Sequence, residues 1–255
     1  MGLKGFMEEA YGGQGRVRKL ATRRGSQVVS VEDLADRLGP RPSRAEVAEL
    51  APAEGLLRLI ESPPAQKRGA VIWGYLTSLA AEQSASPICV PAGDWAGLEM
   101  AGGRLILQPG LRPPSHVGER MKGGRISMLV AGEYLGQEMH GGGIVCSACS
   151  GFAFRNMRGG FGVVKGNAAD HLGVGNAGGR ILVRGSAGAR AGWLMRLGRL
   201  VILGDCADYL GLRQSGGEIL VRGAAGCRAG LQRRGGRLVA GAVGAEAGDV
   251  SIRCI

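Results

Sequence analysis

The sequence has few aromatic residues and few cysteines, and it contains no long apolar run. Aromatic residues make up 4% of its 255 residues. Six cysteines are too few for a disulfide-stabilised scaffold, so we expect reduced thiols. No apolar stretch approaches the ~20 residues of a membrane-spanning helix, and residues 1–6 carry no apolar signal segment. These absences predict a cytoplasmic protein.

Glycine, in contrast, is abundant, with 48 residues where an ordinary protein has about 7%. The every-third-residue glycine of collagen is missing. An apolar content of 45% is enough for a core, which argues against full disorder. Residues 91–255 hold 38 of the glycines and +9 of the net charge of +11. The basic excess therefore belongs to the glycine-rich part of the chain.

The chain divides near residue 90. We expect residues 1–90 to form a mixed, partly helical region, because Ser30 and Ser43 each begin a capping-box pattern. Residues 11–25 hold five basic residues and four glycines, which predicts a mobile basic arm. Residues 70–81 are apolar and fit either a helix or a buried strand. This region could cap the domain that follows it or dock a partner.

Residues 91–255 repeat, and the repeat is the strongest signal in the sequence. A Gly-Gly pair recurs every 18 to 21 residues and is altered once, to Leu197-Gly198. A single glycine precedes most pairs by five residues, but the fourth repeat has Phe154 there. The glycines that we assign to structural turns are Gly123, Gly124, Gly141, Gly142, Gly159, Gly160, Gly178, Gly179, Gly216, Gly217, Gly235 and Gly236.

A short segment rich in Ile, Leu and Val follows each pair and predicts a strand of four or five residues. A period of 18–19 residues is too short for two helices and fits one coil of a β-solenoid, with coils stacked about 4.8 Å apart. The sequence therefore predicts a mainly β protein. About eight such coils form a glycine-rich domain over residues 91–255, after the mixed N-terminal region.

Arginines recur at equivalent positions of the repeat. Some follow the glycine pair directly and others stand at the strand ends; these partner-facing candidates are Arg180, Arg199 and Arg237, and Arg184 and Arg222. Equivalent positions stack in a solenoid, so these like charges repel unless something neutralises them. An acidic protein partner is the interpretation we favour over solvent and salt. Nucleic acid is the least favoured, because aromatic residues are few and no known module is present.

Cysteine spacing suggests half of a metal site and no more. Cys146 and Cys149 have the spacing of half a zinc or iron–sulfur site, but no second pair follows. We expect both to pack inside the coils as small apolar residues. Cys206 and Cys227 occupy comparable places and are expected to do the same. We therefore predict no metal site in this chain.

No catalytic constellation is visible in the sequence. His116, His140 and His171 stand beside turns of different coils, and we expect no carboxylate or nucleophile beside them and a surface position for His140. Residues 173–178 match a dinucleotide-binding fingerprint, but the strand and helix that the motif needs are not predicted around it. We predict no catalytic residue, and no residue can be assigned to a cofactor.

The repeat Gly-x4-Gly-Gly-x-(Ile/Leu)-x-(Val/Leu)-x-Gly-x-Ala-(Gly/Asp), best seen at 173–188 and 211–226, resembles the GXGXG domain. One branch of that family is the β-helical subunit of formylmethanofuran dehydrogenase, with its counterpart in the formyltransferase/hydrolase complex. Another is the C-terminal domain of the glutamate synthase large subunit. The resemblance covers about residues 91–255 and implies a right-handed β-helix. The near-uniform spacing favours the first branch.

The resemblance implies a non-catalytic scaffold subunit in an oxidoreductase complex of one-carbon metabolism, where it bridges catalytic subunits. Any molybdenum or tungsten pterin, iron–sulfur cluster or zinc would belong to those partner subunits. The alternative branch implies an accessory subunit of a glutamate synthase-type amidotransferase, with FMN on its partner. A stand-alone basic binding protein is the second alternative.

Overall fold

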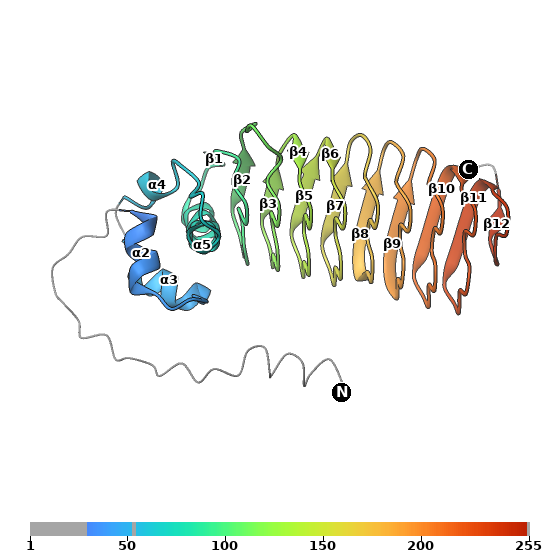
Figure 1. Cartoon of the computed structure of the whole chain (residues 1–255), viewed down its shortest axis with the longest axis horizontal. Helices are drawn as coiled ribbons and strands as arrows, with labels where there is room; N and C mark the ends of the chain where they lie inside the picture. Colours follow the sequence, from blue (N-terminus) through green and yellow to red (C-terminus); the bar gives the residue numbers. More distant parts are fainter. Residues whose placement is uncertain (1–29, 53–54, 254–255) are drawn as a thin grey trace.

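The protein is a parallel β-solenoid with a group of helices at one end, in a computed structural model that describes residues 30–52 and 55–253 (Figure 1). The predicted basic arm lies outside the described residues. The helices are α2 (Val31–Arg37), α3 (Arg44–Leu50), α4 (Leu56–Leu59) and α5 (Lys67–Gln83). The main sheet contains, in spatial order, β1 (Ile88–Val90), β2 (Arg104–Leu107), β3 (Arg125–Ser127), β5 (Gly143–Cys146), β7 (Phe161–Val164), β8 (Ala177–Val183), β9 (Leu197–Ile202), β10 (Glu218–Ala225), β11 (Arg237–Val243) and β12 (Ser251–Ile252). A smaller sheet pairs β4 (Val130–Ala131) with β6 (Ala148–Cys149).

The strands stack in the register that the repeat predicts. All neighbouring strands are parallel, and Phe161 pairs with Arg180, Arg180 with Arg199, and Arg199 with Glu218. These pairs are 19 residues apart in sequence, so each turn of the chain, called a rung below, is one repeat. The predicted solenoid of about eight coils is confirmed. Strand β1 begins at Ile88, so the first rung starts inside the region that we expected to be partly helical.

The second glycine of each pair has a packing reason beyond its backbone conformation. Gly124, Gly142 and Gly217 have positive φ angles, between 71° and 76°. A Cβ on Gly142 would also lie 2.7 Å from the methyl group of Met121 in the preceding rung. A column of buried residues fills this space along the solenoid: Met100, Met121, Met139, Met157, Asn176, Met195 and Gln214. Flexible thioether side chains suit such irregular gaps.

The two polar members of this column differ in how well they are satisfied. Asn176 donates to the carbonyl oxygen of Gly179 at 3.0 Å and accepts from the amides of Gly178 and Gly179. Gln214 also donates through Nε2, to the carbonyl oxygens of Gly216 and Gly217, but its buried Oε1 has no hydrogen-bond partner. A buried acceptor without a donor costs free energy.

We expect methionine to be tolerated better at position 214 than at position 176. Asn176→Met should lower the free energy of unfolding by about 1–2 kcal/mol, because three hydrogen bonds of a satisfied amide are lost. Gln214→Met also loses the hydrogen bonds that Nε2 donates, but it removes the unsatisfied oxygen as well, so its loss should stay below about 1 kcal/mol. Thermal unfolding followed by circular dichroism measures both, and a larger loss for Gln214→Met than for Asn176→Met would contradict this explanation.

The N-terminal helices begin where the sequence predicts them. Ser30 accepts a hydrogen bond from the Asp33 amide and Ser43 from the Glu46 amide, and both capping boxes are complete. The apolar stretch 70–81, which fitted a helix or a strand, lies within helix α5. This helix buries the side chains of Ile72, Trp73 and Leu76 completely.

Helix α5 takes the place of a missing rung at the start of the solenoid (Figure 1). The single glycine that stands five residues before a glycine pair normally donates its amide to a carbonyl oxygen of the preceding rung. Gly118, for example, donates to Ala96 at 2.9 Å. In the first rung, the amide of Gly97 donates to the Thr77 hydroxyl at 3.0 Å instead. Similarly, the Ala101 amide donates to the Glu82 carboxylate at 2.7 Å. Side chains of α5 therefore supply hydrogen-bond acceptors for the backbone amides of the first rung. Without α5, this rung would expose a sheet edge.

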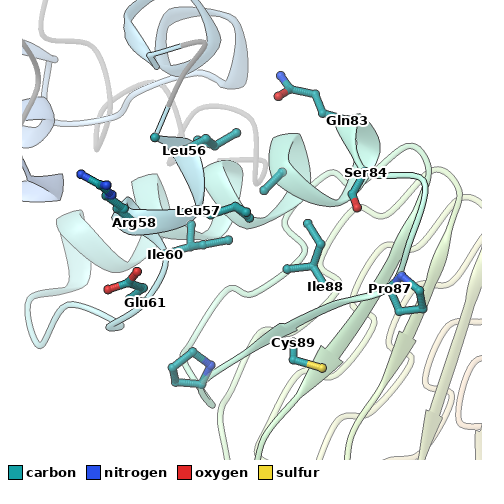
Figure 2. Close-up of a pocket in the computed structure, with 13 residues that line it drawn as sticks. Leu56, Leu57, Arg58, Ile60, Glu61, Gln83, Ser84, Pro87, Ile88 and Cys89 are labelled. Carbon is teal, nitrogen blue, oxygen red and sulfur yellow. The ribbon is translucent and has the colours of Figure 1, made fainter.

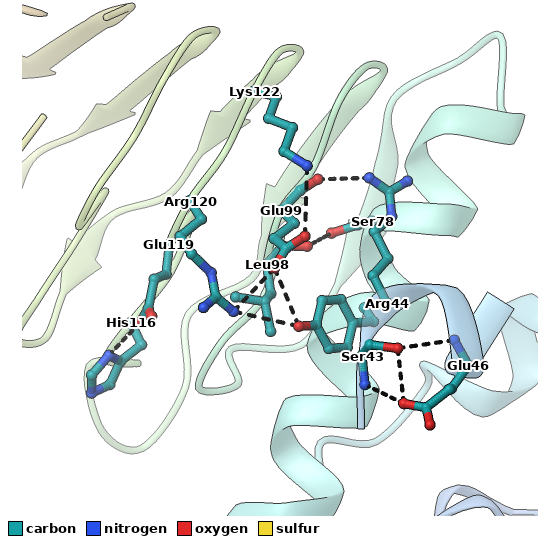
Figure 3. Close-up of polar contacts among 11 residues, drawn as sticks. Ser43, Arg44, Glu46, Ser78, Leu98, Glu99, His116, Glu119, Arg120 and Lys122 are labelled. Atoms are coloured by element: carbon teal, nitrogen blue, oxygen red, sulfur yellow. Dashed lines mark hydrogen bonds and ion pairs between the residues drawn. The ribbon is translucent and has the colours of Figure 1, made fainter. Parts of the chain in front are cut away.

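Polar contacts around Glu99 reinforce this cap (Figure 3). The Glu99 carboxylate lies 3.1 Å from the Arg120 guanidinium and 3.4 Å from the Tyr75 hydroxyl. Arg44 forms an ion pair with Glu82 and donates to the carbonyl oxygen of Glu99 at 2.8 Å. Burial raises the pKa of Tyr75, and the Glu99 charge adds to the effect, so the phenol stays protonated at neutral pH.

Candidate protein-docking face

The outward face of the main sheet presents three parallel columns of side chains that run along the solenoid axis. Side chains alternate along each strand, so residues two apart share a face. Along β8 and the residue after it, Ile181 and Val183 point into the core, while Arg180, Leu182 and Arg184 point outward. The same alternation holds for the neighbouring strands, so each outward position continues from rung to rung.

The middle column is apolar. It is named here the outer apolar column and consists of Ile106, Val145, Val163, Leu182, Val201 and Leu220, with Ser127 at the β3 position. Each of the six keeps part of its side chain exposed, Ile106 most of all at 39%. The described helices lie at the β1 end, away from β7–β10 (Figure 1). None of the described helices therefore covers this strip.

Basic residues flank the outer apolar column on both sides. The column next to the glycine pairs, the inner basic column, holds Arg180, Arg199 and Arg237, and Glu218 stands between the last two. The opposite column, the outer basic column, holds Lys165, Arg184 and Arg222, and Leu203 stands between the two arginines. The predicted stacking of Arg180 on Arg199 is confirmed. Arg184 and Arg222 also occupy equivalent strand positions, as predicted, and one rung separates them.

The chain neutralises part of this charge itself. Glu218 contacts Arg199 at 3.0 Å and Arg237 at 2.9 Å. Both arginine side chains are more than half exposed, so these pairs contribute little to stability. Over β7–β11 the outward positions still carry six basic side chains against one acidic one. The face therefore keeps a positive field along both edges of the apolar strip.

One aromatic residue interrupts the inner basic column. Phe161 is 36% exposed and its ring spreads over Gly143, where a Cβ would meet the ring. The Arg125 guanidinium reaches across from the other side and lies 5.7 Å from the ring centroid. Arg125 stands three rungs from Arg180 at the equivalent strand position and is paired with Arg104, so basic residues resume in this column beyond Phe161 and Gly143.

The cysteines are divided between the core and the surface. Cys146 and Cys149 are buried as expected, and a hydrogen bond between the two thiols, together with burial, raises the pKa of Cys146. Cys206 is buried in a column of small residues with Ala187 and Ala225, and burial raises its pKa to about 12. Cys227 is exposed, so the expectation of interior packing is wrong for it. It stands two residues after the inward position of its rung, which Ala225 occupies.

This division predicts which thiols react. At pH 8 we expect N-ethylmaleimide to modify Cys89 and Cys227, because both are exposed. We expect Cys146, Cys149 and Cys206 to stay unmodified in the folded chain, because the reagent cannot reach a buried thiol. Peptide mass spectrometry before and after unfolding measures this, and fast labelling of Cys146 in the native state would contradict the burial.

The histidines do not assemble into a catalytic group in the part of the chain that the structure describes. His140 is exposed, as expected. The expectation that none contacts a carboxylate is wrong, because His116 Nδ1 lies 2.7 Å from Glu119 Oε2. His116 and His171 belong to a stack of rings at one corner of the solenoid, made of Trp95, His116, Tyr134, Phe152 and His171 with centroids 4.4–5.3 Å apart. All five have positive φ angles, so the stacking stabilises a strained corner.

A groove of about 1130 Å³ lies between α4, the end of α5 and β1 (Figure 2). Its charged lining residues are Arg58 and Glu61, and Cys89 contributes a thiol. No described histidine lines it, and residues 30–52 and 55–253 contain no group of three or more His, Cys, Asp or Glu side chains that could hold a metal ion. The outer sheet face, with its continuous columns of equivalent side chains, is the candidate site that we develop below.

Comparison with protein-family models and with curated protein sequences gives no match. No helix in the described ranges 30–52 and 55–253 combines the length and the apolar composition needed to span a bilayer.

Two features of the solenoid were missed by sequence analysis. The outer apolar column was hidden because segments such as residues 180–184 consist of one apolar run between two charged residues. The ring stack was hidden because its members are of different residue types.

Proposed function

We propose that the chain is a non-catalytic scaffold subunit that binds partner subunits through the outward face of its solenoid. The observation that carries the proposal is the partly exposed outer apolar column between two basic columns on β7–β10. A continuous apolar strip with a polar rim is typical of a protein-binding surface. The stacked rungs make the face rigid, so that partners bound along it would keep a fixed spacing.

In its specific form, the proposal places the chain in a cytoplasmic formylmethanofuran dehydrogenase-like or formyltransferase/hydrolase-like complex of one-carbon metabolism. The resemblance of the glycine repeat to the GXGXG domain supports this assignment. The parallel β-solenoid, which that resemblance implies, is consistent with it. Molybdenum or tungsten pterin, iron–sulfur clusters or zinc would be held by the partners, and this chain would position those subunits.

Purification of the full chain from its native host tests the proposal. We expect stoichiometric partner subunits in native mass spectrometry, and tungsten, molybdenum, zinc or iron in elemental analysis of the same sample. Partners that carry FMN without these metals would move the chain to the glutamate synthase-type branch. A chain that elutes alone from a gently lysed sample would contradict the scaffold function.

A further inference from the structure

The width of the docking face points to the shape of its occupant. The inner and outer basic columns stand four residues apart on each strand, as Arg180 and Arg184 do, which corresponds to about 13 Å. An α-helix with its side chains is about 10–12 Å in diameter. A single helix laid along the outer apolar column therefore fits between the two basic columns.

The spacing along the axis also favours a helix. Rungs repeat about every 4.8 Å, and one turn of an α-helix rises about 5.4 Å. Apolar residues at positions i, i+4, i+7 and i+11 of a helix would follow Val163, Leu182, Val201 and Leu220 with a mismatch of about 0.6 Å per turn. An extended strand repeats a face every ~6.6–6.8 Å, so it loses register after the first rung.

The charge of the docking face indicates which residues the two flanks of the bound helix should carry. Six basic side chains and one acidic side chain line the face over β7–β11, so carboxylates on both flanks of the helix are complementary to it. A second copy of this chain would bring the same basic columns together. The chain's own residues 11–25 hold five basic residues and no acidic one, so they would also be repelled.

We infer that the face of β7–β10 binds an amphipathic helix of a partner subunit, about three turns long, with an apolar stripe and acidic flanks. The inference rests on the proposed scaffold function and names the partner element that the scaffold holds. The helix lies along the solenoid axis, with its apolar stripe on the outer apolar column. Its carboxylates face Arg180 and Arg199 on one side and Lys165 and Arg184 on the other.

Hydroxyl-radical footprinting and carbodiimide cross-linking of the purified native complex test this inference. We expect side-chain oxidation of Leu182 and Leu220 to fall at least about fivefold relative to the isolated full chain. Oxidation of Leu194, which is 39% exposed on another side of the rung, should stay unchanged. We also expect Lys165 to cross-link to an aspartate or glutamate within an acidic amphipathic segment of the partner.

The failures can be told apart. If partners copurify but the protection lies elsewhere, or Lys165 couples to a segment without apolar periodicity, the helix inference is wrong and the scaffold function stands. Protection of Leu182 by self-association or by copurified nucleic acid overturns the inference in the same way. If no partner copurifies, both the scaffold function and the inference are wrong.

Discussion

Replacing Phe154 with glycine is expected to lower the free energy of unfolding by about 3 kcal/mol. Phe154 is completely buried where most rungs have a glycine. Deleting a buried phenylalanine side chain costs about 3–5 kcal/mol. Glycine at a φ of 57° recovers about 1 kcal/mol of this, because the left-handed conformation strains an ordinary residue. Urea unfolding followed by circular dichroism measures the change.

The strand that follows Phe154 in the same repeat shows why the sequence tolerates this exception. Gly162 stands where other rungs have an inward Ile or Leu, such as Ile144 and Ile181, and a Cβ there would collide with the Phe154 ring. Compared with the ordinary rungs, the large side chain therefore stands at position 154 and the glycine at position 162. We therefore expect Gly162→Ile alone to cost about 1–3 kcal/mol through overpacking.

The double variant distinguishes this exchange from two independent defects. Phe154→Gly with Gly162→Ile recreates the arrangement of the ordinary rungs and should lie within about 1 kcal/mol of the parent chain. Ile144→Gly serves as a matched control, because it removes a buried side chain without a compensating partner. Additive losses in the double variant would show that Phe154 and Gly162 do not share one packing site.

Gly74→Leu is expected to detach the helical cap from the solenoid. A Cβ on Gly74 would lie on the carbonyl oxygen of Trp95, because α5 packs its backbone directly against the first rung. Leucine favours a helix more than glycine by about 1 kcal/mol, so a loss cannot come from the helix itself. We expect a loss of about 2–4 kcal/mol and faster amide exchange in β1 and β2.

Exposure of the first sheet edge would accompany this change. Uncovered strand edges promote association, so size-exclusion chromatography of Gly74→Leu should show higher oligomers. Gly39→Leu is the control, since nothing lies within 4 Å of its added Cβ and its exchange pattern should match the parent chain. Unchanged exchange in β1 and β2 of Gly74→Leu would contradict the role of α5 as a cap.

Much of the fold could be predicted from the sequence because it repeats. The glycine pairs fix the period, and the period alone selects stacked coils, as the 19-residue register of β8, β9 and β10 confirms. The helices capped by Ser30 and by Ser43 were predicted from local capping chemistry. Residues 70–81 stayed open, because an apolar stretch buried on most sides has no clear period.

Only part of the candidate docking face could be predicted from the sequence. The arginines were found because identical residues at equivalent positions mark a column. The outer apolar column was missed, because inward and outward apolar residues alternate without a polar residue between them, as in Ile181, Leu182 and Val183. The position of Cys227 was misjudged, because its 21-residue spacing from Cys206 is two residues longer than the rung period. The hydrogen bonds that Thr77 and Glu82 accept from the first rung depend on how α5 docks, which no local sequence pattern encodes.

The docking face is tested most directly by placing a charge on the outer apolar column. The quantity to measure is the affinity of the purified chain for its copurified partner. Leu182→Glu should weaken binding about 100-fold, because it buries an unpaired carboxylate at the centre of the face. Leu194→Glu adds the same charge elsewhere on the rung and should change the affinity less than about threefold. Thermal unfolding of both variants checks that they remain folded. Equal affinities for Leu182→Glu and the parent chain would contradict the claim that this face holds the partner.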